Sequence, residues 1–459
     1  MNVPKDLRSL RAKSISAKAG SPVSRPGSKR TALAVLALAF SHPALAQSLA
    51  ITGATLAIGD GSEPIRNGTV VISAGKVVAA GAGVAVPPGA KTIDAAGKWV
   101  TPGLVSGFSR VGLAEVPAVK ETNDTSARSP FSAAIDVAPA INPLANPIAV
   151  SRTAGITRAV VAPATGTNIF AGQGAVVDLG ADLDPITKAR AFQYVEMGEA
   201  GAVEAGGSRA AMILTFRMML AQAQDYAKAP ATYDGYSKDA LLNRVDAQAL
   251  VPVVTGAMPL MVHAESARDI LAVLALRQDF PALKLILAGA TEGWMVAPRI
   301  AAARVPVITA GLEDLPSSFE KLAATQSNVG RMVKAGVSVS MGMLTGDDAL
   351  QLRHATQQAG NMVALTKVPG ATGLSWGQAL RTITSAPAEA MGLGDRIGSL
   401  KPGKAGDVVI WDGDPLEMTS APVAVWIDGV QQPVENRQTK LRDRYATPTE
   451  GALPKAYEW

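Results

Sequence analysis

The most constraining feature of the sequence is the alternation of short apolar runs with helical stretches across the middle of the chain. The strand-like runs and helix candidates that alternate are Ala159–Ala162, Ser208–Tyr226, Leu260–Ala264, Ala267–Arg277, Leu283–Ala288, Met295–Ala303, Val305–Thr309 and Val337–Met341. Strands that alternate with helices predict a parallel sheet covered by helices. This alternation favours a parallel barrel over a sandwich or a helix bundle. At 459 residues and 48% hydrophobic content, the chain is long enough for one barrel plus a small accessory domain.

Both flanks of this central region are rich in short β-prone runs between turn residues. One set lies between Leu49 and Val100, and a second returns in Arg396–Pro415 and Val423–Val430. We predict an α/β protein with a (β/α)8 TIM-like barrel and a small composite β-sandwich domain formed from both ends of the chain. The predicted divisions are 47–101 plus 396–435 for the β domain, 102–395 for the barrel and 436–459 for a tail.

The first 46 residues have the order of a secretory leader. A basic stretch up to Arg30 precedes an apolar run, Thr31 to Phe40, and Ala44-Leu-Ala46 is a small-x-small cleavage motif. The apolar run is too short to span a bilayer, so we expect no membrane span after cleavage. The expected location is outside the cytoplasm, periplasmic if the source is a double-membrane bacterium. A transit peptide is the competing interpretation, because the segment is poor in acids.

The positive charge of the chain belongs to this leader. Of 43 Lys and Arg and 38 Asp and Glu, residues 1–46 hold eight and one, which leaves 35 basic and 37 acidic side chains. A nearly neutral remainder lacks the clustered positive field that nucleic acids require, so we expect no nucleic-acid partner.

Side chains suited to soft metal ligation or to covalent catalysis are scarce. The only histidines are His42, His263 and His354, and cysteine is absent. No Cys-His or Ser-His-Asp set can be assembled with a recognisable motif, which disfavours a covalent hydrolase.

Several motifs together resemble the amidohydrolase superfamily, in particular its imidazolonepropionase-like and exported dipeptidase-like members. They are Val100–Leu104, Gly155–Thr157, Ala171–Val176, Val262–Ala264, Ala290–Trp294, Ser385–Ala388 and Pro402–Pro415. The resemblance covers nearly all of the chain after the leader. It implies a hydrolase of carbon–nitrogen bonds, in dipeptides or other amides, and catalytic members of the family use zinc.

The metal-ligand positions of that family are degenerate in this sequence. The His-x-His pair of the first strand becomes Phe108 and Arg110, the fifth-strand histidine is kept as His263, and the sixth-strand histidine falls on Gly289. The aspartate of the eighth strand falls near Leu344. One histidine cannot hold a catalytic zinc, so the resemblance with these exchanges predicts no metal cofactor.

Four residues near these positions are candidates for function. His263 is a residual ligand, a general base or a structural histidine. Arg110 either binds the carboxylate of a ligand or pairs internally with Glu265, Glu292 or Asp347. Glu265 and Glu292 follow the fifth and sixth strands closely and are either acid–base groups or residues at helix starts.

Two further assignments stay open. Asp347 or Asp348, in a shifted loop, would complete a metal site with His263. The bridging Lys or Glu of the family has no clear counterpart, although the neighbourhood of Gln193 is the expected place.

Three functions follow from these observations. The first is a catalytically impaired binding or partner subunit, paired with an active amidohydrolase paralogue. The second is an active carbon–nitrogen hydrolase with a reduced or metal-free site. The third is a periplasmic binder of a small carboxylated ligand, held by Arg110 at the barrel mouth.

Overall fold

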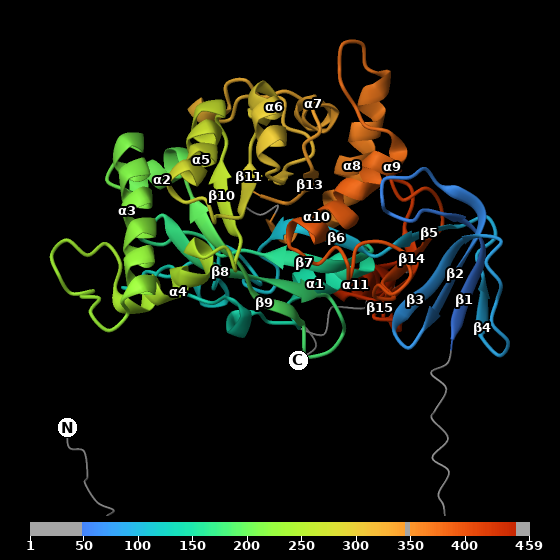
Figure 1. Ribbon diagram of the computed structural model, residues 1–459. Helices are drawn as coiled ribbons and strands as arrows, with labels where there is room; N and C mark the ends of the chain where they lie inside the picture. The colour runs from blue at the N-terminus through green and yellow to red at the C-terminus, as the bar shows by residue number, and fades with distance from the viewer. Residues whose placement is uncertain (1–47, 345–348, 447–459) are drawn as a thin grey trace, which may run out of the picture. The chain divides into compact units, whose positions relative to one another are not determined.

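Two eight-stranded sheets form the framework of the chain (Figure 1). The computed structural model describes residues 48–344 and 349–446. The predicted leader, residues 1–46, lies outside the described residues, so its export function stays a prediction.

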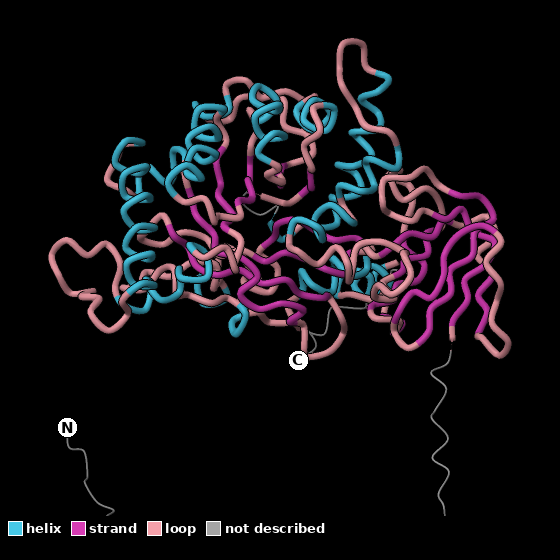
Figure 2. Tube along the Cα trace, viewed as in Figure 1, coloured by secondary structure: helices cyan, strands magenta, loops and turns pink. Residues whose placement is uncertain are grey.

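The first sheet is built from both ends of the chain. Its strands are β1 (Leu49–Leu56), β2 (Ile65–Ser73), β3 (Lys76–Ala82), β4 (Lys91–Asp94), β5 (Trp99–Pro102), β14 (Val408–Trp411), β15 (Pro422–Ile427) and β16 (Val430–Gln432). Strand β14 pairs antiparallel with β5, with Val409 opposite Thr101, and this ladder joins the two ends. Residues 49–102 contain strands and turns but no helix, as Figure 2 shows. The β domain outside the barrel is therefore confirmed, while its exact limits stay a prediction.

The second sheet forms a nearly closed barrel. Its order is β6 (Leu104–Ser109), β7 (Ile156–Val161), β8 (Phe170–Asp178), β9 (Ile186–Glu196), β10 (Leu260–Ala264), β11 (Leu285–Gly289), β12 (Val307–Thr309) and β13 (Val339–Met341). The backbone N–H of Met343, after β13, donates to the carbonyl of Phe108 in β6 at 3.0 Å and brings the last strand back to the first. Side chains of alternating positions fill the interior, among them Phe108, Phe192 and Met261.

Strand β8 departs from the expected parallel arrangement. It runs antiparallel to both β7 and β9, whereas the other neighbouring strands of the barrel are parallel. The connections on its two sides, residues 162–169 and 179–185, are shorter than the dozen or so residues that a parallel crossover needs. The sequence alternation did not predict this hairpin.

Helices lie on the outer side of the barrel strands (Figures 1 and 2). The α-helices are α1 (Asn146–Thr153), α2 (Gly198–Glu204), α3 (Arg209–Lys228), α4 (Arg244–Val254), α5 (Ala267–Asp279), α6 (Gly293–Ala303), α7 (Asn328–Lys334), α8 (Ala355–Ala364), α9 (Trp376–Thr382), α10 (Ser385–Ala390) and α11 (Arg437–Tyr445). Short 3-10 turns in the connections include η3 (Phe319–Lys321) and η5 (Leu352–His354). The three helices predicted above appear as α3, α5 and α6 with ends shifted by a few residues.

Helix starts follow local capping chemistry. Ser208 and Ser266 precede α3 and α5, and each hydroxyl accepts a backbone N–H of the first turn. The tail predicted at 436–459 begins with α11, because Asn436 and Thr439 form a reciprocal capping box. Residues 447–459 lie outside the described residues.

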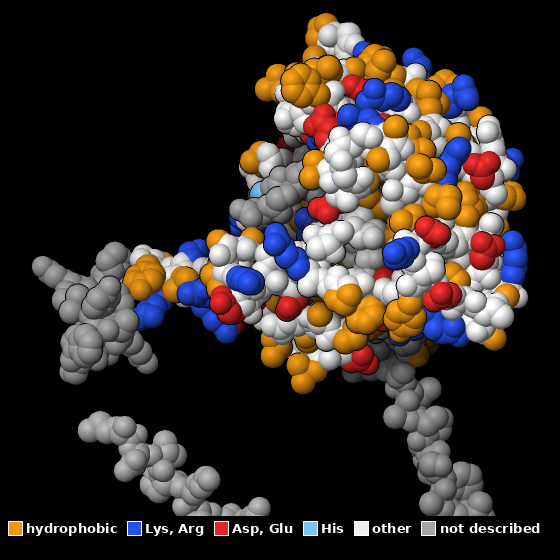
Figure 3. Space-filling model, turned by 90° about the vertical axis from the view of Figure 1, so that its left-hand side faces the viewer, with side chains coloured by type: hydrophobic (Ala, Val, Ile, Leu, Met, Phe, Trp, Pro, Cys, Tyr) orange, Lys and Arg blue, Asp and Glu red, His pale blue; other side chains and the backbone are white. Residues whose placement is uncertain are grey.

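No helix within residues 48–344 and 349–446 has both the length and the apolar character for crossing a membrane. On the face drawn in Figure 3, acidic and basic side chains are interspersed without a large area of one sign. That face therefore offers no broad positive surface for a polyanion such as nucleic acid.

Candidate functional site

The first-strand positions of the expected metal site are occupied by an aromatic ring and a cation. Phe108 in β6 is fully buried inside the barrel, and its ring centroid lies 5.6 Å from that of Tyr194 in β9. The guanidinium carbon of Arg110 lies 5.8 Å from the centre of the Phe108 ring, within the range of a cation–π contact. At the position predicted for the first histidine, the structure therefore places a buried aromatic ring.

His263 sits near the end of β10 between two carboxylates. It pairs in register with Ala288 of β11, whose side chain faces the barrel interior. Its Nδ1 is hydrogen-bonded to Glu196 Oε1, and its Nε2 lies 3.0 Å from Glu265 Oε1. Both ring nitrogens are therefore engaged by carboxylate oxygens, which is the arrangement that suits a protonated imidazole.

A lysine from a distant loop completes this cluster. Lys321 in η3 places its Nζ 3.2 Å from Glu265 and 2.7 Å from Glu313. Thr291 donates its backbone N–H to Glu265 at 2.9 Å, and its hydroxyl lies 2.7 Å from both carboxylates. We call Glu196, His263, Glu265, Glu313 and Lys321 the mouth network.

The electrostatics of the mouth network favour the charged forms of His263, Glu265 and Lys321. Burial by itself would lower the pKa of His263, but the two flanking carboxylates hold that pKa well above its ordinary value. Burial would raise the pKa of Glu265, yet His263, Lys321 and Thr291 hold it well below its usual range. Burial likewise opposes the charge of Lys321, while Glu265 and Glu313 raise its pKa.

Tyr194 connects this network to the aromatic ring. Its hydroxyl donates to Glu196 Oε2 at 3.1 Å. Burial, together with the neighbouring charge of Glu196, raises the pKa of Tyr194 well above its ordinary value, so the phenol stays protonated and keeps donating. Contacts thus run continuously from Arg110 and Phe108 to His263 and Glu265.

Gly289, the position predicted for the sixth-strand histidine, lies next to Glu265 of the mouth network. An ideal Cβ on Gly289 would lie 2.7 Å from the carboxyl carbon of Glu265, so the carboxylate occupies the space that a side chain there would need. The backbone of Gly289 has φ +87°, a conformation that favours glycine. Both observations indicate that a larger side chain at this position would be strained.

We expect Gly289→Ala to lower the free energy of unfolding by roughly 2–4 kcal/mol, through backbone strain and displacement of Glu265. Gly336→Ala is the matched control, because φ is +88° there and nothing lies within 4 Å of the added Cβ. The control should cost only the backbone part, about 1–2 kcal/mol. Urea denaturation of both variants measures the difference, and equal losses would contradict the displacement of Glu265.

Two of the predicted partners of Arg110 are wrong. Glu265 pairs with His263 and Lys321 instead. Glu292 accepts the backbone N–H groups of Ala267 and Ala323, both at 3.0 Å, and thereby ties the start of α5 to the loop after η3. Both carboxylate oxygens of Glu292 therefore accept backbone N–H groups that would otherwise lack a partner. The third predicted partner of Arg110, Asp347, lies outside the described residues, and so does Asp348.

Leu344 and Gln193 were the predicted neighbourhoods of the eighth-strand aspartate and of the bridging Lys or Glu. Leu344 packs against the interior cluster that contains Phe108 and Tyr194. Gln193 is fully buried, but strand alternation turns it away from the interior face that Phe192 and Tyr194 share.

Sequence reasoning missed Glu196, Tyr194, Lys321, Thr291 and Glu313. The period of two along β9 was an available signal for Glu196, which shares the parity of Tyr194 and pairs in register with His263. Lys321 and Glu313 lie in the connection after β12, and no local pattern marks them.

These residues do not fit a zinc ion. A zinc site takes three or four ligands with free lone pairs, and His263 has both nitrogens bound to carboxylates. Among residues 48–344 and 349–446, no group of three His, Asp or Glu side chains has the geometry to hold a metal.

Comparisons with known proteins agree in one family. A family model described as Amidohydrolase family matches residues 262–432. Amidohydrolase tasK from Hapsidospora irregularis is 25% identical over 382 residues, covering 76% of this chain and 38% of that protein. The chain thus spans well under half the length of this curated relative.

Two solved structures are similar over most of the chain. An amidohydrolase from Thermotoga maritima MSB8 is 25% identical, with a TM-score of 0.73, and the match covers 85% of this chain and 100% of that chain. Molinate hydrolase is 19% identical, with a TM-score of 0.50, over 89% and 98% of the two chains, and its likeness concerns the fold alone.

Proposed function

Because the chain belongs to the amidohydrolase superfamily, we propose that it is a member in which an ion-pair network has replaced the metal centre. Members of the superfamily typically depend on a metal, commonly zinc. In this proposal the barrel mouth no longer supports metal-dependent hydrolysis, and the chain works as a binding or partner subunit.

The observation that carries the proposal is the commitment of His263. A ligating imidazole presents a nitrogen lone pair to the metal, whereas this ring lies between Glu196 and Glu265 and is held protonated by them. Protonation removes the lone pair, so a metal would have to displace a proton and two carboxylate contacts before it could bind.

Charge balance supports the same conclusion. Glu196, Glu265 and Glu313 bring three carboxylates to the mouth, and protonated His263 together with Lys321 supplies two positive charges there. A divalent cation contributes the same total of two in a metallohydrolase. The network therefore compensates two of the three carboxylate charges from within the chain, and an added metal would meet cations already in place.

The partner part of the proposal rests on the length of the relative. The matching region is only 38% of Amidohydrolase tasK, so in that protein it is carried together with much additional polypeptide. We propose that this chain likewise works beside a second polypeptide, an active amidohydrolase-type chain, outside the cytoplasm. A small carboxylated ligand at the mouth, near Arg110, is compatible with the same role.

Metal analysis tests the loss of the centre. We expect the full chain, purified with zinc present, to retain less than about a tenth of a zinc ion per chain by inductively coupled plasma analysis, because the ligand set is incomplete. A stoichiometric metal that disappears in His263→Ala would overturn the proposal.

An active carbon–nitrogen hydrolase is the competing function, and the pairing of His263 with two carboxylates favours it as an acid–base group. A screen of small amides and dipeptides decides between the two. Turnover that is lost in both His263→Ala and Arg110→Ala would favour the hydrolase, whereas absence of turnover across the screen supports the binding or partner role.

A further inference from the structure

A cavity of about 360 Å³ lies at the opposite edge of the barrel, where strands β9 to β12 begin. Lys188 lines it from the start of β9, and Lys284 lines it immediately before β11. A second cavity of about 260 Å³ adjoins it and shares Arg304 and Pro306 with it. Strand β10 separates this region, the barrel floor, from His263 by about 10 Å, so the two sites are distinct.

The floor cavity is lined by four cations and one carboxylate. The cations are Lys188, Arg277, Lys284 and Arg304. The carboxylate, Glu389, is already paired with Arg381. Among the described residues, no ion pair within 4.0 Å involves any of the four cations. The cavity therefore carries an excess of positive charge.

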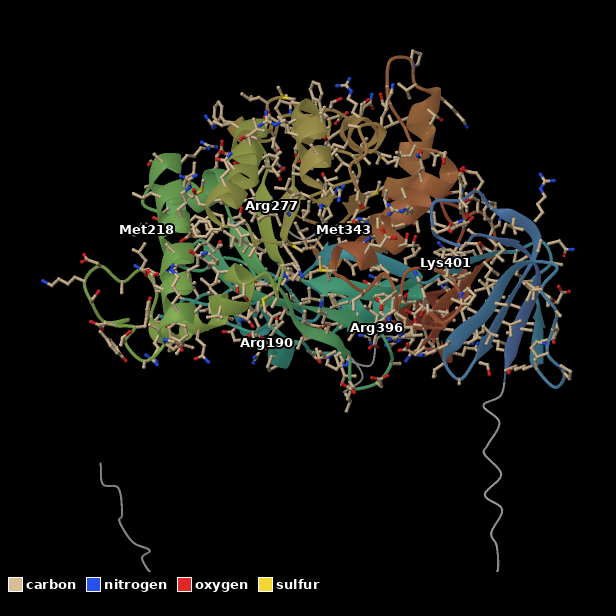
Figure 4. All side chains as sticks on the ribbon, viewed as in Figure 1. Arg190, Met218, Arg277, Met343, Arg396 and Lys401 are labelled. Carbon is tan, nitrogen blue, oxygen red and sulfur yellow. The ribbon has the colours of Figure 1, made fainter. Side chains whose placement is uncertain are left out.

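Two of these cations are held in place by backbone carbonyls. Arg277, labelled in Figure 4, comes from the last turn of α5 and donates to Leu283 at 3.1 Å and to Ala303 at 2.6 Å. Lys188 donates to the carbonyl of Met391 at 3.1 Å. Neutral carbonyls fix the positions of both groups and leave their charges uncompensated, with further N–H donors on each.

Burial acts against these charges. It lowers the pKa of Lys188, and the nearby Arg396 and Lys284 lower it further, while burial alone lowers the pKa of Arg277. An anion among these groups would relieve both effects, because it supplies the opposite charge at short range.

A neighbouring cavity shows the contrast. The cavity of about 760 Å³ beside β7 is lined by cations and carboxylates in similar number, and its central Arg158 is paired with two of the aspartates that line it. Carboxylates in that cavity are at least as numerous as cations, so the chain itself supplies negative charge there. The floor cavity lacks this balance, because one lining carboxylate faces four cations.

We propose that the barrel floor binds a compact polyanion with phosphate or carboxylate groups, held by Lys188, Arg277, Lys284 and Arg304. Arginine and lysine together suit such oxygens, since the guanidinium offers two parallel donors and the ammonium a point charge. The volume fits a small ligand. This site does not depend on the function proposed for the mouth.

Isothermal titration of the full chain with inorganic pyrophosphate and with citrate, at constant ionic strength, tests the floor site. We expect saturable binding of at least one probe, and Lys284→Gln/Arg304→Gln should weaken it by at least about tenfold through the loss of two charged contacts. Both side chains are exposed, so this double variant should keep the fold.

Arg299→Gln/Lys334→Gln is the matched control, because both residues are exposed and neither lines the cavity. It should leave the dissociation constant within about twofold, since distant exposed charges are screened. Binding of pyrophosphate alone identifies phosphate as the ligand chemistry, and binding of citrate alone identifies carboxylate. No saturable binding of either probe, or equal weakening in both double variants, would overturn the proposal.

Discussion

Replacing Arg158 with leucine should lower the free energy of unfolding by about 3–5 kcal/mol, because the change leaves a buried carboxylate without its partner. Arg158 lies in barrel strand β7 and is 3% exposed. Its Nε and Nη2 donate to the two oxygens of Asp407 at 2.8 and 3.0 Å. Nη2 also lies 2.8 Å from Asp428. Asp407 comes just before β14, so the pair connects the barrel to the sheet formed by the chain ends.

Urea denaturation at pH 7 measures this loss, and Arg217→Leu is the control. Arg217 pairs with Asp279 at 3.2 Å, but both side chains are about half exposed. An exposed pair contributes little, so the control should change stability by no more than about 1 kcal/mol. A loss for Arg158→Leu as small as that of the control would contradict the structural role.

Asp178 and Asp407, which both lie beside Arg158, should differ in how much stability is lost on substitution by asparagine. Burial raises the pKa of Asp178 to about 6, although Arg158 acts in the opposite direction from 3.7 Å. A raised pKa means that folding disfavours this charge, so Asp178→Asn should be tolerated better than Asp407→Asn.

His263→Leu should be the second most damaging substitution, with an expected loss of about 3–5 kcal/mol at pH 7. The change removes the cation between Glu196 and Glu265, and the side chains of these carboxylates are 11% and 2% exposed. Lys321 still faces Glu265 in the variant, but among the described side chains Glu196 keeps only the hydroxyl of Tyr194. His354→Leu, at the end of η5, is the control and should cost much less.

The pH dependence of stability distinguishes this mechanism from simple loss of packing. The pKa of His263 is raised in the folded state, so its contribution is complete below the unfolded value of 6.5 and is lost as pH rises through the folded value. Glu265 has a lowered pKa, so its contribution is present above 4.5 and is lost as pH falls through its folded value.

The variant should keep gaining stability as pH falls below 6.5, where the contribution of His263 to the parent chain is already complete. Without the imidazolium, two neighbouring buried carboxylates favour protonation, so the stability of His263→Leu should rise as pH falls from neutral toward 4.5. Unfolding curves at several pH values between 5 and 9 measure both profiles. A variant profile parallel to that of the parent chain would show that charge is not the cause.

Much of the fold could be predicted from local pattern. The run Leu260–Ala264 was predicted with the bounds that β10 has, and α5 and α6 were placed within a few residues. Apolar periodicity and capping residues act within a few positions of the chain, which explains this success. The antiparallel β8 was missed, because its direction depends on the lengths of two loops and on pairing with distant strands.

The candidate site was predicted only in part. Phe108, Arg110 and His263 were assigned from motif spacing, and contacts connect all three. Two of the three predicted acidic partners of Arg110, Glu265 and Glu292, bind other groups instead. The choice between nearby acids depends on side-chain positions that no motif records.

By itself the sequence determined the class of fold, because strand and helix periodicity is set by residue type and local spacing. The exchange of metal ligands at the first and sixth strands stays a prediction from motif spacing. Only the tertiary structure decided which cations face the carboxylates at the barrel mouth. Lys321 reaches Glu265 from a loop far along the chain, and Glu196 reaches His263 across a strand pair. Ion pairs form where folded elements bring charges within a few ångströms, and that proximity is a property of packing rather than of sequence order.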